Sequence, residues 1–213
     1  FISTLNQWLW SRFDFSIGDL GYCTAILFGL WSLRKFSFKR HFIFVLTLLG
    51  LTVVLFYTAW GIHYFKTPIR EQRQLPEMLS EVQLIQSTTY YAQQLTALHN
   101  KLAASPDDKV LIEASPKKIL QLATEVMGSS ALRPYKINGK AKATLFPTLL
   151  GYMGFGGYLN PFTHEAQVNT LQPKLKIITT ACHEIAHQWG YSVEDEANYI
   201  SIKASTSAEN LLV

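Results

Sequence analysis

Two histidines and a glutamate near the C-terminus have the residue types and spacing of a metal site. His183 and His187 stand four residues apart in "ACHEIAHQWG", and Glu184 directly follows the first histidine. On a helix, residues i and i+4 lie about 6 Å apart along the axis, so both imidazoles can bind one metal ion. A glutamate beside the first histidine can deprotonate a metal-bound water without binding the metal itself. The motif therefore predicts a Zn²⁺ site with Glu184 as general base.

The alternative is that these residues form the polar face of an ordinary helix. Pro173 and Gly190 are typical of the start and end of a helix, so we expect one helix between them. Its apolar residues recur at spacings of three and four, which predicts one buried stripe: Leu175, Ile178, Cys182, Ile185 and Trp189. The two histidines point about 150° away from the centre of that stripe, with Glu184 on the same side. We therefore expect them to face solvent or a cleft, and Cys182 to be a packing residue.

A catalytic zinc also needs a third protein ligand and an open position for water. A second helix is predicted in "YSVEDEANYI", with Ser192 as its N-cap. Glu194 and Glu196 are the candidates, and we expect only one of them to bind because residues two apart on a helix face different ways. Glu194 is the favoured third ligand and Glu196 the alternative. Asn198 lies one turn beyond Glu194, where it can orient a ligand histidine. The competing interpretation is an acidic first turn that interacts with the helix dipole.

Two apolar stretches near the N-terminus predict transmembrane helices at residues 17–33 and 42–62. The second has no charged residue and is long enough to span, since about 20 apolar residues cross a bilayer. The first is shorter and holds Asp19 near one end, so a buried helix is its alternative. The composition agrees with a membrane protein: 16% of residues are charged, against about 25% in soluble domains.

The loop between these stretches predicts the topology. It reads "RKFSFKRH", and short basic loops stay in the cytoplasm. We therefore expect a multi-pass protein of the bacterial inner membrane, with residues 1–65 as membrane region and 66–213 as an extracytoplasmic, periplasmic domain. Basic residues after the second stretch weaken the contrast in charge. The net charge of +4 shows no nucleic-acid-binding pattern, so no nucleic-acid partner is expected.

The remaining sequence indicates a mainly α protein with a small β element. Helices are predicted at 75–102 and 116–128, the second with Ser115 as N-cap. Residues 135–169 predict loops and short strands, including one edge strand in "HEAQVNTL". His164 and Glu165 in that segment could line a cleft, but a structural role is favoured for both.

The motifs resemble those of known families. HExxH followed by Glu-x-x-x-Asn is similar to the gluzincin metallopeptidases. More specifically, "FDFSIGDLGY", "FTHEAQVNTLQ", "ACHEIAHQWG" and "EDEANYI" resemble the bacterial domain-of-unknown-function 3810 family. The resemblance implies a zincin-like domain behind N-terminal membrane helices, with zinc held by His183, His187 and Glu194. Asn198 stands where many relatives have Asp, and "HEAQVNTL" falls where zincins keep the strand that pairs with substrate.

The same resemblance implies another membrane helix before this sequence and further helices after it. The sequence lacks an initiating Met and stops at "SAENLLV", so we expect a C-terminal truncation. The expected function is zinc-dependent peptide-bond hydrolysis by a membrane-anchored peptidase, with a peptide or protein as substrate and the lipid bilayer as partner. The alternatives are a non-catalytic zinc-containing sensor or binding protein and a structural subunit of a membrane assembly. Four tyrosines are candidates for stabilising the oxyanion: Tyr152, Tyr158, Tyr191 and Tyr199.

Overall fold

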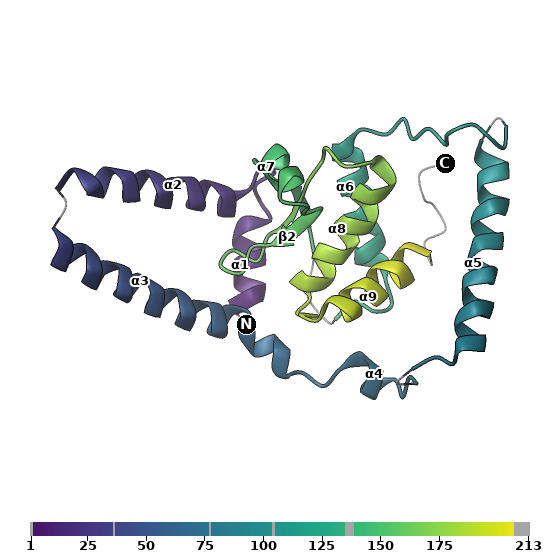
Figure 1. Cartoon of the computed structure of the whole chain (residues 1–213), viewed down its shortest axis with the longest axis horizontal. Helices are drawn as coiled ribbons and strands as arrows, with labels where there is room; N and C mark the ends of the chain where they lie inside the picture. The colour runs from purple at the N-terminus through teal and green to yellow at the C-terminus, as the bar shows by residue number, and fades with distance from the viewer. Residues whose placement is uncertain (1, 36, 77, 104, 135–138, 207–213) are drawn as a thin grey trace. The chain divides into compact units, whose positions relative to one another are not determined.

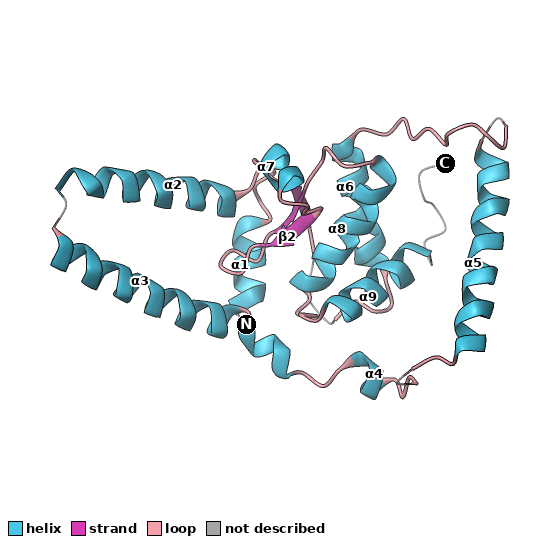
Figure 2. Cartoon of the chain, viewed as in Figure 1, coloured by secondary structure: helices cyan, strands magenta, loops and turns pink. Residues whose placement is uncertain are grey.

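The computed structural model describes residues 2–35, 37–76, 78–103, 105–134 and 139–206 of the chain. They form two compact units: one combines residues 1–66 with 114–213, and the other contains residues 67–113. Within these residues the chain is mainly helical and has a small three-stranded sheet (Figure 2), which confirms the predicted class. The units divide the chain differently from the predicted membrane and water-exposed regions, because residues 1–66 belong to the same unit as the C-terminal half.

The N-terminal part of the first unit is a series of helices (Figure 1). They are α1 (Ile2–Trp10), α2 (Ile17–Ser32), η1 (Leu33–Lys35), α3 (Phe38–Ala59) and η2 (Gly61–Phe65). Among the described residues, only α3 is long and apolar enough to cross a membrane, and none of its side chains is buried. α2 has 16 residues, fewer than the roughly 20 that span a bilayer. The structure thus supports one of the two predicted spans.

The core of the first unit consists of three helices and a sheet. α6 (Pro116–Ser129), α8 (Lys174–Gln188) and α9 (Glu194–Thr206) pack against one another (Figure 1). The Ser115 side chain accepts a hydrogen bond from the Lys118 amide, which confirms the predicted cap of α6. The strands are β1 (Ala141–Ala143), β2 (Gly157–Leu159) and β3 (Ala166–Val168), and α7 (Pro147–Tyr152) connects β1 to β2. All three strands contact α8.

The sheet corrects the prediction for "HEAQVNTL". Its strand, β3, lies in the centre of the order β1-β3-β2, with β1 parallel and β2 antiparallel to it. The prediction of an edge strand is therefore wrong. All three residues of β3 are buried, as expected for a strand covered on both faces and paired on both sides. The two edge strands are β1 and β2, and β2 pairs Tyr158 with Gln167.

α8 begins and ends close to its predicted limits. Trp189 is its C-cap, and Gly190 follows with a φ of +83°, a left-handed conformation that glycine adopts without strain. Four predicted stripe residues are buried, but Leu175 is 61% exposed. Ile177 takes its place in the first turn and is fully buried. The buried face is wider than one stripe because α6, α9 and the sheet all contact the helix.

The second unit contains α4 (Ile69–Gln72) and α5 (Glu81–Leu102). α5 begins six residues later than the helix predicted at 75–102. Ser80 and Gln83 form a capping box, in which the Ser80 hydroxyl accepts from the Gln83 amide and the Gln83 side chain accepts from the Ser80 amide. This reciprocal cap fixes the start of the helix at Glu81.

Candidate metal centre

α8 and the first turn of α9 bring His183, His187 and Glu194 together. One Glu194 oxygen lies 3.1 Å from Nε2 of His183, and the other lies 3.5 Å from Nε2 of His187. Ligands bound to a tetrahedral zinc at about 2.0–2.1 Å lie about 3.3–3.4 Å from one another. The three side chains therefore have the types and the spacing that a zinc ion requires.

The turn between the helices places Glu194. Gly190 closes α8, and α9 starts at Glu194 itself. The prediction that Ser192 caps α9 is wrong: its hydroxyl is buried and has no hydrogen-bond partner among the described residues. The carbonyl of Val193 instead accepts the first helical hydrogen bond, from the Ala197 amide. Glu194 thus projects from the very start of the helix, next to the histidines.

Both histidines are held in one orientation through the ring nitrogen that faces away from the cluster. Nδ1 of His183 lies 2.9 Å from Oδ1 of Asn198, and Nδ1 of His187 lies 2.6 Å from the Tyr191 carbonyl. Because both partners are acceptors, each Nδ1 donates a proton. In the neutral rings this leaves the Nε2 lone pairs directed at the cluster, which is the arrangement of metal-ligating histidines.

Glu196, the alternative third ligand, is not part of this cluster. Among the described residues, His183, His187 and Glu194 are the group whose ligand atoms lie within 4.8 Å of one another. The charge of Glu196 acts on Lys66 instead, where it raises the pKa of the lysine against the larger lowering effect of burial. The structure therefore favours Glu194 over Glu196.

Glu184 lies beside the cluster and is only 5% exposed. Burial, and then the negative charge of Glu194, raise the pKa of Glu184 to about 8. A divalent cation held by the neighbouring ligands would oppose both effects and favour the carboxylate. The β2 backbone runs directly against this side chain: a Cβ added to Gly157 would lie 2.9 Å from Oε1 of Glu184. A side chain at residue 157 would thus collide with Glu184.

The cluster opens into a cleft of about 800 Å³. His183, Glu184, His187, Glu194 and Asn198 form its polar wall, as the sequence predicted for a cleft-facing pair. The segment around β2 forms a second wall, and the end of α3 with η2 forms a third. The residues of these two walls include Phe155, Gly157, Tyr158, Leu159, Phe56, Trp60 and Tyr64.

A family model described as "Protein of unknown function (DUF3810)" matches residues 1–213. The chain belongs to the DUF3810 family. This confirms the family resemblance seen in the sequence motifs, and the match includes both the membrane-helix region and the candidate metal centre. No curated protein and no solved structure matches the chain.

The four tyrosines proposed as oxyanion donors lie in different places in this DUF3810 protein. Tyr158 lines the cleft, but its hydroxyl donates a hydrogen bond to the buried Asp19. Tyr152 is 88% exposed and lies outside the cleft, and the cleft walls do not include Tyr191 or Tyr199. The cleft wall instead includes Tyr64, which was not among the four predicted donors. The one feature of the sequence that could have pointed to Tyr64 is its position just after the apolar stretch at residues 42–62.

His164, Glu165 and Cys182 are all buried, in agreement with the structural roles that the sequence favours for them. His164 is fully buried against Trp60, with ring centroids 5.9 Å apart. Glu165 is buried in an ion pair with Lys142, at 2.6 Å. Cys182 is fully buried in the core, and burial raises its pKa to about 12.

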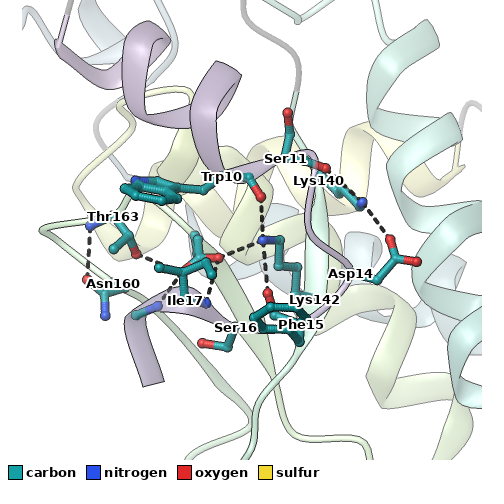
Figure 3. Close-up of polar contacts among 12 residues, drawn as sticks. Trp10, Ser11, Asp14, Phe15, Ser16, Ile17, Lys140, Lys142, Asn160 and Thr163 are labelled. Atoms are coloured by element: carbon teal, nitrogen blue, oxygen red, sulfur yellow. Dashed lines mark hydrogen bonds and ion pairs between the residues drawn. The ribbon is translucent and has the colours of Figure 1, made fainter. Parts of the chain in front are cut away.

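The Glu165 carboxylate also caps the N-terminus of α2. It accepts hydrogen bonds from the amides of Ile17 and Gly18, at 3.1 and 2.6 Å, and from the Thr163 hydroxyl. Its partner Lys142 donates in addition to the carbonyls of Trp10 and Phe15 (Figure 3). The start of α2 is thus bound to the sheet by charged groups that are themselves buried.

Asp19, in the first turn of α2, extends the same connection to β2. Its carboxylate accepts hydrogen bonds from the Thr144 hydroxyl, the Leu145 amide and the Tyr158 hydroxyl. Burial raises the pKa of Tyr158, and the hydrogen bond to Asp19 raises it further, so the phenol stays protonated. Since Tyr158 belongs to β2, the first turn of α2 positions a strand that lines the cleft.

Proposed function

We propose that this protein is a membrane-anchored, zinc-dependent peptidase. The observation that carries the proposal is the cluster of His183, His187 and Glu194, with Nε2 of each histidine 3.1 or 3.5 Å from a Glu194 oxygen and each Nδ1 bound to an acceptor. Such a site has three protein ligands and leaves a fourth position for water, as catalytic zinc sites do. The adjacent cleft has room for a peptide.

The chain supplies the groups that peptide hydrolysis needs. When bound, Zn²⁺ would lower the pKa of a coordinated water and polarise a scissile carbonyl. Glu184 would take the proton of the attacking water and deliver it to the leaving nitrogen. His183, His187 and Glu194 would hold the metal, while Asn198 and the Tyr191 carbonyl would fix the imidazole orientations.

The edge strand β2 gives the substrate a place to bind. β2 lines the cleft and lies at one end of the three-stranded sheet (Figure 2). An extended peptide can add to such an edge through main-chain hydrogen bonds. This would carry its backbone past Glu184 and the metal ligands, because Gly157 in β2 lies against Glu184. In this proposal β2, and not the strand in "HEAQVNTL", pairs with the backbone of the substrate.

For localisation, we propose a multi-pass protein of the bacterial inner membrane. α3 supports membrane anchoring, and α2, joined to it by a short basic segment, is proposed as a second span. The start of α2 is hydrogen-bonded to Glu165 beside β3, and Trp60 at the end of α3 packs against His187 in α8. The basic segment joins the opposite ends of the two helices. Basic loops remain in the cytoplasm, which would put the site on the periplasmic side.

The first test compares wild type with Glu184→Gln, both as the full chain in detergent. We expect wild type to bind one zinc per chain, measured by elemental analysis, and to hydrolyse a quenched fluorescent peptide library. Glu184→Gln should retain the zinc and lose at least about 100-fold in rate, because it removes the proton acceptor but no metal ligand. Wild type that binds zinc but cleaves no faster than Glu184→Gln would refute the peptidase proposal and favour a sensor or structural subunit.

Two further variants identify the third ligand. Glu194→Ala should lose zinc and activity together, because it removes a ligand. Glu196→Ala is the matched control on the same helix turn and should retain both. Zinc loss in Glu196→Ala with retention in Glu194→Ala would contradict the proposed ligand set.

A further inference from the structure

The end of the candidate membrane span is part of the cleft wall. α3 ends at Ala59, and the cleft is lined by Phe56 inside this helix, by Trp60 directly after it and by Tyr64 in η2. Phe56 lies three residues before the end of the helix, or about 4.5 Å along its axis. The cleft therefore reaches the last turn of the apolar segment.

Contacts hold this end of α3 against the metal centre. The Trp60 ring packs edge-on against the ring of the proposed ligand His187, with centroids 5.8 Å apart, and Trp60 is only 7% exposed. Just beyond η2, Lys66 Nζ donates a hydrogen bond to the Gly190 carbonyl at 3.0 Å. One side chain thus separates the proposed metal ligands from the end of the span.

An apolar surface continues from the cleft to α2. Leu149, Met153 and Phe155, in and after α7, are all more than half exposed. Phe155 lines both the cleft and a second recess of about 570 Å³ between α2 and α7. The lining of this recess is mostly apolar, and its polar groups are those of Asp19, Tyr22 and Tyr158. Exposed apolar patches of this kind indicate a surface that contacts a membrane or another molecule. Here the patch of Leu149, Met153 and Phe155 adjoins the apolar helices α2 and α3. A lipid bilayer is the environment that suits the patch and both helices.

From this geometry we infer that the substrate is a polypeptide segment at the membrane surface, next to its own membrane anchor. The inference rests on the proposed peptidase function and names its substrate class. With the end of α3 and the rim around Phe155 at the lipid–water boundary, the cleft opens at the level of the lipid headgroups. A segment that leaves the bilayer beside the cleft is held near β2 at high effective concentration, which a free peptide lacks.

The test uses the full chain in vesicles of phosphatidylcholine and phosphatidylglycerol. The probe is a random-sequence peptide library fused to one transmembrane helix, either directly or through a flexible Gly/Ser spacer of about 30 residues, which separates the two by roughly 30 Å. The same library without an anchor is the third arm. We expect directly anchored peptides to be cleaved at least tenfold faster than either other library, with cut sites mapped by mass spectrometry close to the anchor.

The outcomes separate this inference from the proposed function. Equal cleavage of all three libraries, above the level of Glu184→Gln, would leave the peptidase function intact and overturn the substrate inference. No cleavage of any library above Glu184→Gln would overturn the peptidase function itself, and the substrate inference with it.

A measurement of membrane depth checks the geometry without activity. Spin labels at Phe155→Cys and Leu149→Cys are compared with one at Glu125→Cys on the exposed side of α6, all with Cys23→Ala. Labels at 149 and 155 should be accessible to lipid-soluble oxygen, and the label at 125 to a water-soluble nickel chelate. Aqueous accessibility at 155 equal to that at 125 would overturn the inference.

Discussion

Gly157 in β2 lies so close to Glu184 that no side chain fits at position 157. A Cβ on Gly157 would lie 2.6 Å from the Gln167 carbonyl oxygen and 2.9 Å from Glu184 Oε1, so either β2 or Glu184 must move in Gly157→Ala. A shift of the proposed base by a fraction of an ångström should lower the hydrolysis rate by about 10–100-fold. Zinc content should be unchanged, because no ligand is displaced.

Gly128→Ala in α6 is the matched control for this substitution. A Cβ there meets nothing within 4 Å, so activity should remain at the wild-type level. Steady-state rates and elemental analysis on the same samples check both variants. Full activity in Gly157→Ala would show that the position of Glu184 against β2 is not required.

His164 gives the fold a pH dependence of defined sign. Burial first, and then the charge of His63, lower the pKa of His164 to about 4. An unfolded histidine has a pKa of about 6.5, so between these values the unfolded state binds the additional proton. Stability should be complete above pH 6.5, decline as the pH falls towards 4, and level off below it.

The shift in the pKa of His164 corresponds to a loss of at most about 3 kcal/mol in unfolding free energy, since one pKa unit is worth roughly 1.4 kcal/mol. His164→Asn removes the titrating ring and suits the position, where φ is +56° and asparagine is tolerated. Thermal unfolding measured from pH 7 to 4 should show a shallower decline in this variant. The two profiles would be parallel if His164 does not contribute.

The residues of the candidate metal centre could be predicted because their geometry is local. His183, Glu184, His187, Glu194 and Asn198 lie within 16 positions on two consecutive helices, and helical periodicity orients each of them. The sequence favoured Glu194 but left Glu196 open, since that choice depends on how the turn at Gly190 folds. The contributions of Trp60 and Gly157 to the site could not be predicted, because they depend on contacts between segments far apart in the sequence.

At the scale of elements, the attachment of α2 to the sheet rests on the buried Glu165. Both of its oxygens face donors: one accepts from Ile17 and Lys142, the other from Gly18 and Thr163. In Glu165→Gln the amide NH₂ would therefore face donors in either orientation, and Lys142 would lose its buried counter-charge. We expect a loss of about 3–5 kcal/mol in unfolding free energy, measured by denaturant titration in detergent.

Two control variants locate the cause of that loss. Lys142→Met should cost less, because Glu165 keeps the two amides of α2 and the Thr163 hydroxyl as donors. Asp14→Asn removes the exposed ion pair with Lys140 (Figure 3) and should change stability little. A Glu165→Gln variant as stable as Asp14→Asn would show that this network does not hold α2.

The ends of helices could be predicted from the sequence where capping residues, proline or glycine determine them. Ser115 with Pro116 began α6, and Gly190 ended α8, as predicted. The position of β3 within the sheet could not be predicted, because the sequence of a three-residue strand does not distinguish an edge strand from a central strand. The attachment of α2 to the sheet was equally hidden, although Asp19 in an apolar stretch was a signal that could have pointed to it.

At the scale of the whole molecule, one compact unit is assembled from two segments that are distant in sequence. Residues 1–66 and 114–213 join through contacts such as Gln7 to the Gln188 carbonyl, at 2.9 Å, and the Lys142–Glu165 network. A protease recognition sequence inserted after the exposed Lys109 would allow one specific cut in the other unit. We expect both fragments to remain associated on size-exclusion chromatography in detergent and to retain zinc.

The same cut in a Glu165→Gln chain provides the comparison. Because that chain lacks the Glu165 carboxylate, which accepts hydrogen bonds from the Ile17 and Gly18 amides of the other segment, its fragments should separate at a lower denaturant concentration. Immediate separation of the wild-type fragments would contradict the assembly of the unit from these two segments.

The partners of Asp19 have a consequence for how the protein is made. They are synthesised long after it: the Thr144 hydroxyl follows Asp19 by 125 residues. At about 5–20 residues per second, the ribosome needs roughly 6–25 s to cover that interval. For that time the nascent chain carries Asp19 without the three groups that bind its carboxylate in the folded protein. The first turn of α2 can therefore dock against the sheet only after β2 has been synthesised.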